Sequence, residues 1–202
     1  MVREKLINKN DAVLRVDPNS LDTLLHPTLD EKSSIKVIAN GLPASPGAVS
    51  GKVVFSSEEA ERLNDMMQDT ILVRVETSPE DIQGMHAAKG ILTSRGGMTS
   101  HAAVVARGMG RPCVSGSSEI EINYDKKVFK TSSAEIKEGE TITIDGSTGR
   151  IILGTVPTIK PEISGDFSKL MSWADKIRKL KVRTNYETCL LYTSPSPRDN
   201  SG

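Results

Sequence analysis

Three short β-like runs, each followed by a helix, constrain the fold of this chain more than any other feature. The runs lie at residues 52–55, 70–75 and 91–93. Ser56 and Glu59 form a capping-box pattern after the first run. Ser78-Pro79-Glu80-Asp81 starts a helix after the second, because it joins a cap, a first-turn proline and acidic residues. A third helix is expected over residues 101–109, and short strands with helices between them predict a compact α/β domain.

Weaker patterns extend this domain to residues about 35–155. Further strands are expected at residues 35–38, 112–115, 141–144 and 150–153, the last two forming a hairpin through residues 145–149. Residues 41–47 read Gly-Leu-Pro-Ala-Ser-Pro-Gly, so we expect a rigid, turn-rich segment there.

The segments on either side are expected to be linkers. Residues 1–34 are polar with scattered leucines and predict helix, with a helix that starts at Asp17-Pro18 and ends at His26-Pro27. Residues 156–185 begin as a proline-containing linker, and residues 166–180 have the apolar spacing of an amphipathic helix. Residues 186–202 lack periodicity and read more like translated adaptor sequence than a folded segment, so we expect disorder there.

The composition excludes several function classes. Lys+Arg and Asp+Glu both number 26, and this balance argues against a nucleic-acid-binding surface, which is usually basic. The sequence has no apolar run of membrane-spanning length and no secretory signal. Cys113 and Cys189 lack the spacing of metal ligands, so we expect no metal site and a reducing, intracellular compartment. The first residues look internal to a longer protein, so cytoplasm, plastid and other organelles stay open.

The run Gly-Gly-Met-Thr-Ser-His before an alanine-rich helix carries the predicted chemistry. The imidazole of His101 can be phosphorylated, because a histidine is largely neutral near pH 7 and a ring nitrogen then has a free lone pair. A phosphoryl group there would meet the N-terminus of the helix, where backbone N–H groups favour anions. Gly96 and Gly97 leave room for close approach, and Thr99 and Ser100 supply hydroxyl donors and a helix cap.

Other interpretations of the same run stay open. The Gly-Gly loop and helix end could hold a free anion in a binding module that is not an enzyme, or the domain could be a spacer between two enzymes. A pure anion site does not need an imidazole, and a spacer needs neither histidine nor glycines. Arg95 and Arg107 could touch a phosphate or be salt-bridged, and Cys113 is expected to be a small buried residue.

Residues 96–114 resemble the phosphohistidine signature of pyruvate, phosphate dikinase, a PEP-utilising enzyme. Further stretches that resemble the same family lie at residues 24–27, 41–47, 75–81, 145–149 and 179–185, so the resemblance covers about residues 1–185. Phosphoenolpyruvate synthase and enzyme I of the phosphotransferase system have related signatures. Met98 and the Gly-Met-Gly-Arg-Pro-Cys run favour the dikinase.

The resemblance implies a phosphoryl carrier. The family converts ATP, phosphate and pyruvate into AMP, pyrophosphate and phosphoenolpyruvate. A swivelling β/β/α domain carries phosphate on a histidine from an ATP-grasp domain to a barrel that binds pyruvate. By resemblance, His101 is the tele-phosphohistidine, residues 35–155 are the carrier, and Mg²⁺ binds in domains outside this chain, in a full-length homodimer. Thr99 matches a regulatory phosphorylation site of plant members; otherwise it would only cap the helix.

Overall fold

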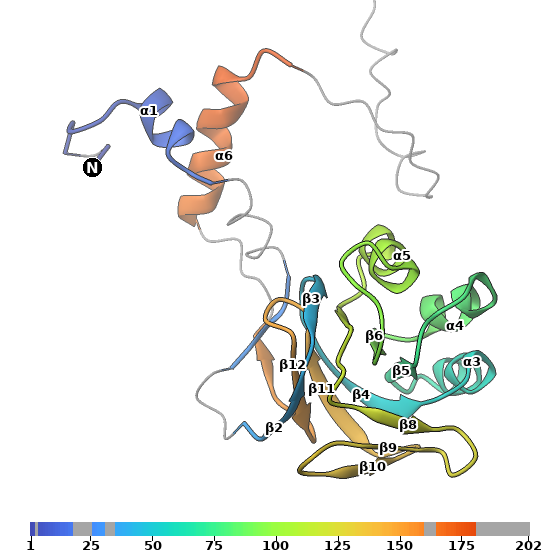
Figure 1. Cartoon of the computed structure of the whole chain (residues 1–202). Helices are drawn as coiled ribbons and strands as arrows, with labels where there is room; N and C mark the ends of the chain where they lie inside the picture. Colours follow the sequence, from blue (N-terminus) through green and yellow to red (C-terminus); the bar gives the residue numbers. More distant parts are fainter. Residues whose placement is uncertain (3, 18–25, 31–34, 160–164, 181–202) are drawn as a thin grey trace, which may run out of the picture. The chain divides into compact units, whose positions relative to one another are not determined.

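The computed structural model describes residues 1–2, 4–17, 26–30, 35–159 and 165–180 (Figure 1). The described residues fall into two compact units, one containing those of 1–16 and 165–180 and the other those of 17–159. In the first unit, α1 (Lys9–Leu14) packs against α6 (Gly165–Ile177), with Lys9 Nζ 5.8 Å from the centroid of the Trp173 ring. The amphipathic helix predicted over residues 166–180 is therefore confirmed.

The second unit is built on an eight-stranded sheet. Its strand order is β2 (Val37–Asn40), β12 (Arg150–Leu153), β11 (Thr141–Asp145), β4 (Ala48–Val54), β5 (Thr70–Arg74), β6 (Gly90–Thr93), β7 (Cys113–Ser115) and β3 (Leu42–Ser45). Strands β4 to β7 run parallel, and the other pairings are antiparallel. The predicted hairpin is confirmed, since Asp145 pairs with Arg150 across the turn between β11 and β12.

Three helices cover one face of the parallel strands (Figure 1). They are α3 (Ser57–Asp65), α4 (Ile82–Ala87), which follows a 3₁₀ turn at Pro79–Asp81, and α5 (His101–Met109). Half of the predicted capping box is present, because Ser56 Oγ accepts a hydrogen bond from the Glu59 N–H at 3.2 Å, whereas the Glu59 carboxylate binds Arg62. Alanines of α5 allow close packing: Ala102, Ala103 and Ala106 are buried in the same cluster as Cys113 of β7.

A small antiparallel sheet belongs to the other β layer. It consists of β8 (Glu121–Asn123), β9 (Val128–Lys130) and β10 (Glu135–Lys137), with β9 in the centre. Phe129 of β9 is fully buried in one apolar cluster with Ile71 of β5 and Ile142 of β11. Burial on both sides of β4 to β7 yields two β layers and one helical layer, which confirms the predicted α/β class.

The segment at residues 41–47 corrects the expectation of a turn. Leu42–Ser45 is strand β3, and it pairs only with β7 at the edge of the large sheet. Pro43 lies opposite Val114, and the register shifts between Pro43 and Ser45. Proline lacks a backbone N–H, but an edge strand can accommodate it, particularly beside a bulge.

Residues 1–34 contain a strand as well as a helix where the structure describes them. Within the described part of that segment, α1 is the only helix, and Thr28–Leu29 forms strand β1 with Thr158–Ile159 (β13). The partner strands are far apart in the sequence, so their pairing left no local signal. The helix predicted after Asp17 falls at 18–25, outside the described residues, as does the predicted disorder of 186–202. The boundaries 1–34, 35–155 and 156–185 stay predictions. No helix in the described ranges is long and apolar enough to cross a membrane.

Candidate functional site

Two loops meet at one edge of the parallel strands. Strands β5 and β6 are parallel neighbours whose last residues, Arg74 and Thr93, are paired, so the loops that follow them leave the sheet side by side. Backbone hydrogen bonds join the two loops, with the Arg95 N–H donating to the Val75 carbonyl at 2.9 Å. This arrangement brings Thr77, two residues beyond Val75, to the helix that begins at His101.

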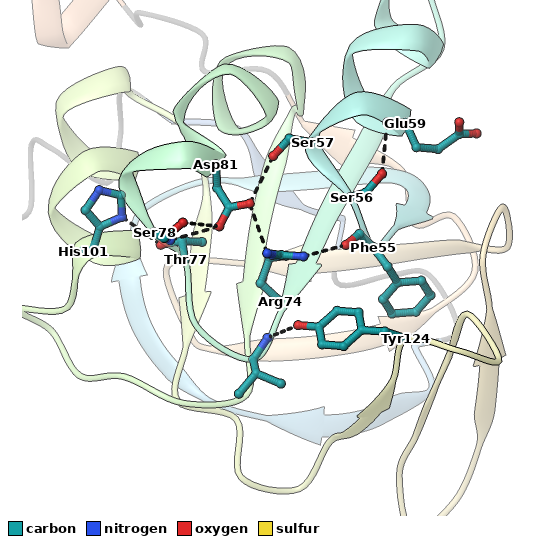
Figure 2. Close-up of polar contacts among 11 residues, drawn as sticks. Phe55, Ser56, Ser57, Glu59, Arg74, Thr77, Ser78, Asp81, His101 and Tyr124 are labelled. Atoms are coloured by element: carbon teal, nitrogen blue, oxygen red, sulfur yellow. Dashed lines mark hydrogen bonds and ion pairs between the residues drawn. The ribbon is translucent and has the colours of Figure 1, made fainter.

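His101 is the first residue of α5 and is half-buried. Its Nδ1 lies 3.0 Å from Thr77 Oγ1 (Figure 2). A hydroxyl can either donate or accept a hydrogen bond. When Nδ1–H donates to Thr77, Nε2 on the far side of the ring carries the free lone pair, as a nucleophile requires.

Ser100 caps the helix that carries His101. Its Oγ accepts from the Ala103 N–H at 3.4 Å and lies 3.3 Å from Ser115 Oγ, which in turn is 3.1 Å from Thr93 Oγ1. The capping role considered for Thr99 therefore belongs to Ser100, and Thr99 is exposed. The capped N-terminus directs the positive end of the helix dipole toward the site.

The two predicted glycines differ in their surroundings. Gly96 has φ +110°, and a Cβ there would lie 2.9 Å from Ser100 Cβ and 3.1 Å from Ser115 Oγ. A Cβ on Gly97 would have no atom within 4 Å. Gly96 is therefore required by the loop itself, whereas any need for Gly97 would come from an approaching partner.

A buried carboxylate fixes the loop after β5 (Figure 2). Asp81 is only 4% exposed, and its Oδ2 accepts hydrogen bonds from Ser78 N–H at 2.9 Å and from Ser78 Oγ at 3.3 Å. Asp81 Oδ1 accepts from Ser57 Oγ at 3.1 Å and lies 3.3 Å from Arg74 Nη2. Arg74 Nη1 also donates to the Phe55 carbonyl at 3.0 Å. These contacts hold the residue that follows Thr77, so they also restrict Thr77.

Tyr124 secures the start of the same loop. Its hydroxyl accepts from the Val75 N–H at 2.8 Å, and the Arg74 guanidinium lies 5.4 Å from the centroid of its ring. The loop is therefore anchored on both sides of Thr77.

A cavity of about 240 Å³ opens beside His101. Its walls are formed by Glu76, Thr77, Arg95, Gly96, Ser100, His101 and Ala102. The structure thus brings together His101, Gly96 and Ser100 of the predicted site, while Gly97 and Thr99 are absent from this wall. Within the described ranges, no group of three or more His, Cys, Asp or Glu side chains could hold a metal ion.

The family model described as "PEP-utilising enzyme, mobile domain" matches residues 66–149. Residues 66–149 belong to the PEP-utilising enzyme mobile-domain family. The mobile domain therefore contains His101 and both loops of the site.

Curated relatives match beyond the mobile domain. Pyruvate, phosphate dikinase of Rhizobium meliloti (strain 1021) is 57% identical over 188 residues, which cover 93% of this chain and 21% of that protein. Pyruvate, phosphate dikinase of Clostridium symbiosum is 54% identical over 190 residues, covering 93% and 22%. The chain thus spans about a fifth of the length of these relatives. The NMR solution structure of Enzyme I (nEIt) is 24% identical, with a TM-score of 0.32, covering 55% of this chain and 40% of that one.

Thr77 and Glu76 are residues of the candidate site that sequence reasoning missed. The available signal was their place after a strand that neighbours the strand before His101. Two other candidates have structural roles: Arg107 Nη2 donates to the Ala44 carbonyl at 2.8 Å, and burial raises the pKa of Cys113 to about 12. His86 is exposed near the end of α4, and His26 precedes the mobile domain.

Proposed function

We propose that this chain is the phosphoryl-carrier domain of a pyruvate, phosphate dikinase, which converts ATP, phosphate and pyruvate into AMP, pyrophosphate and phosphoenolpyruvate. The contact between Thr77 Oγ1 and His101 Nδ1 carries the proposal, because it engages one ring nitrogen and leaves Nε2 as the nucleophile. The names of the relatives, which are 54–57% identical, support this enzyme.

The carrier step requires only the ring of His101 and a donor held by another domain. The Nε2 lone pair attacks phosphorus, the N–P bond forms, and the bond from phosphorus to the leaving oxygen breaks. Thr77 Oγ1 accepts Nδ1–H before transfer and donates to Nδ1 once the phosphorylated ring has lost that proton. In the second transfer, the acceptor oxygen attacks phosphorus and the N–P bond breaks, so the overall kinetics are ping-pong.

The phosphoryl group on Nε2 would lie at the N-terminus of α5. This nine-residue helix directs its dipole at the group, and the Ser100 cap holds the first turn. Gly96 keeps side-chain atoms away from the loop that faces the same cavity. Phosphoryl transfer depends mainly on positioning and charge neutralisation, so this simple site is sufficient for a carrier.

Other domains of the full-length protein would supply the substrate sites. By the resemblance, these are an ATP-grasp domain and a barrel that binds phosphoenolpyruvate and pyruvate, in a homodimer. Mg²⁺ would bind in those domains, because the described residues beside His101 offer Glu76 as the one carboxylate on the cavity wall. Residues 35–155 would swivel between the two partners on the segments at 1–34 and 156–185.

Thr99 is a candidate regulatory site. Its side chain is exposed two residues before His101. A phosphate there would set a second dianion against the transferring group and oppose phosphorylation of His101. Thr99→Glu in the full-length enzyme should therefore suppress labelling of His101, whereas Thr99→Ser should retain it.

Phosphoenolpyruvate synthase or an enzyme I-like phosphotransferase would use the same carrier step. The sequence of the neighbouring domains in the full-length protein would distinguish these enzymes from the dikinase. An anion-binding module or a spacer would take up no covalent phosphate.

Labelling with a donor carrying ³²P in the transferred phosphate tests the proposal in the full-length enzyme. Wild type should acquire acid-labile, base-stable phosphate, and His101→Asn, which keeps size but removes the nucleophile, should acquire none. The 202-residue chain alone should form no phosphoenolpyruvate. Label that persists in His101→Asn, or that maps to Thr99 or Ser100, would refute the assignment.

A further inference from the structure

We propose that Arg95 is the cation that this domain itself supplies to the phosphoryl group on His101, an inference that rests on the proposed carrier function. Arg95 lines the same cavity as His101, from the loop that precedes α5. It directly precedes Gly96, the glycine that the loop conformation requires.

The backbone of Arg95 is held from both sides. Its N–H donates to the Val75 carbonyl at 2.9 Å, and its carbonyl accepts from Thr93 Oγ1 at 2.8 Å. The Cα is therefore fixed at the edge of the cavity, whereas the residue as a whole is exposed. A long side chain on a fixed Cα can reach a group that forms on the neighbouring ring.

The guanidinium of Arg95 is uncommitted, in contrast to its neighbours. Arg74 binds Asp81 and the Phe55 carbonyl, Arg107 binds the Ala44 carbonyl, and Arg111 Nη2 donates to the His86 carbonyl at 2.9 Å. For Arg95, no side-chain hydrogen bond or ion pair is present among the residues that the structure describes. A free guanidinium has the donor geometry that matches two phosphate oxygens.

The other charge on the cavity wall gives such a cation a role. Glu76 is exposed and lines the same cavity, so its carboxylate would repel a phosphoryl dianion. Without Arg95, the helix dipole alone would oppose this repulsion. Arg95 also lines a second cavity of about 390 Å³ together with Ser94 and Glu121, so space is available on both sides of its Cα.

Chemical phosphorylation allows a test without partner domains. Phosphoramidate would phosphorylate the 202-residue chain: the Nε2 lone pair attacks phosphorus, the P–N bond of the reagent breaks, and ammonia leaves. The ³¹P resonance of phosphohistidine then reports protonation of the phosphoryl group as pH changes. Comparison with His101→Asn shows which resonance comes from phosphorylated His101 and which from His26 or His86. If wild type lacked the His101 resonance, the carrier function itself would be refuted.

The variants separate the contribution of Arg95 from general charge effects. Arg95→Gln should move the midpoint of the phosphoryl titration upward by about half a pH unit, because a nearby cation stabilises the dianion. Arg95→Lys should restore part of the shift, and Glu76→Gln should move the midpoint downward. Arg62→Gln, which removes an exposed arginine paired with Glu59, is the matched control and should leave it unchanged. The inference would be overturned if Arg95→Gln and Arg95→Lys still showed the His101 resonance but had the same phosphoryl titration midpoint as wild type.

Discussion

Thr77 Oγ1 lies 3.0 Å from Nδ1 of His101, although 24 positions separate the two residues in the chain. The parallel pairing of β5 with β6 produces this proximity, since the loop after each strand leaves the sheet at the same edge. The contact engages Nδ1 with the protein and leaves Nε2 as the nucleophile of the proposed reaction.

Replacing Thr77 with valine should slow phosphorylation of His101. Valine keeps the shape of threonine but removes the hydroxyl, and loss of one hydrogen bond worth about 0.5–1.5 kcal/mol corresponds to a roughly 2- to 12-fold slower reaction. Phosphoramidate labelling measures the rate, and ¹⁵N NMR of the ring measures the populations of the two tautomers. Thr77→Ser should restore both. A valine variant with the wild-type tautomer population would contradict the role assigned to Thr77.

Asp81 should matter more for stability than an exposed aspartate does. Its carboxylate is buried and binds Ser78, Ser57 and Arg74. Asp81→Asn presents an amide to the Arg74 guanidinium, and we expect a loss of about 2 kcal/mol in the free energy of unfolding. Urea denaturation measures the loss.

Asp69→Asn is the matched control for Asp81→Asn. Asp69 and Lys89 form a 4.0 Å ion pair with side chains that are 60% and 42% exposed, so its loss should cost less than about 0.5 kcal/mol. Equal losses for the two variants would contradict the role assigned to the Asp81 network.

The sequence predicted those parts of the fold that local patterns encode. Strands β4, β5 and β6 are short apolar runs, and α3 and α5 begin at serines that cap them, Ser56 and Ser100. Strand β3 contains a proline and was expected to be a turn, because its strand character comes from pairing with β7. The sheet of β8, β9 and β10 was not anticipated, since its burial depends on Phe129 reaching a distant apolar cluster.

The site was predictable only along one segment of the chain. His101, Gly96 and Ser100 are close in sequence, so the helix N-terminus could be built from local rules. Thr77 and Glu76 come from the loop after β5, and their proximity requires the order and direction of the strands. The periodicity of a sequence does not encode the order of its strands. The proximity of the Thr77 hydroxyl and the Glu76 carboxylate to His101 therefore emerged only from the structure.

Cys113 should resist thiol reagents in the folded protein. Burial raises the pKa of its thiol from 9.0 to about 12, because a thiolate would lose its hydration there. In a Cys189→Ser background, a thiol reagent at pH 8 should therefore label Cys113 only after unfolding. The unfolded thiol ionises at lower pH than the folded one, so this group favours unfolding as pH rises above about 9. Rapid native-state labelling would contradict its burial.

The two glycines before His101 provide a matched pair of substitutions. Gly96→Ala places a Cβ at φ +110°, 2.9 Å from Ser100 Cβ and 3.0 Å from Ser100 Oγ. We expect a loss of about 1–3 kcal/mol in the free energy of unfolding, because both the backbone conformation and the contact with the cap are unfavourable. Gly97→Ala meets no atom within 4 Å and should change stability by less than about 0.5 kcal/mol.

The rate of His101 phosphorylation should provide a second test of the different roles of Gly96 and Gly97. The Cβ of Gly97→Ala extends into open space on the loop that leads to His101, so it should obstruct a docking domain while leaving the domain folded. Phosphoramidate, a small donor, should label Gly97→Ala at the wild-type rate, whereas phosphorylation of the same variant in the full-length enzyme should be slower. Thermal unfolding and the two labelling rates together check this expectation. If Gly97→Ala lowered stability as much as Gly96→Ala, the loop would require both glycines for its own conformation, and the proposed steric role of Gly97 toward a partner would be wrong.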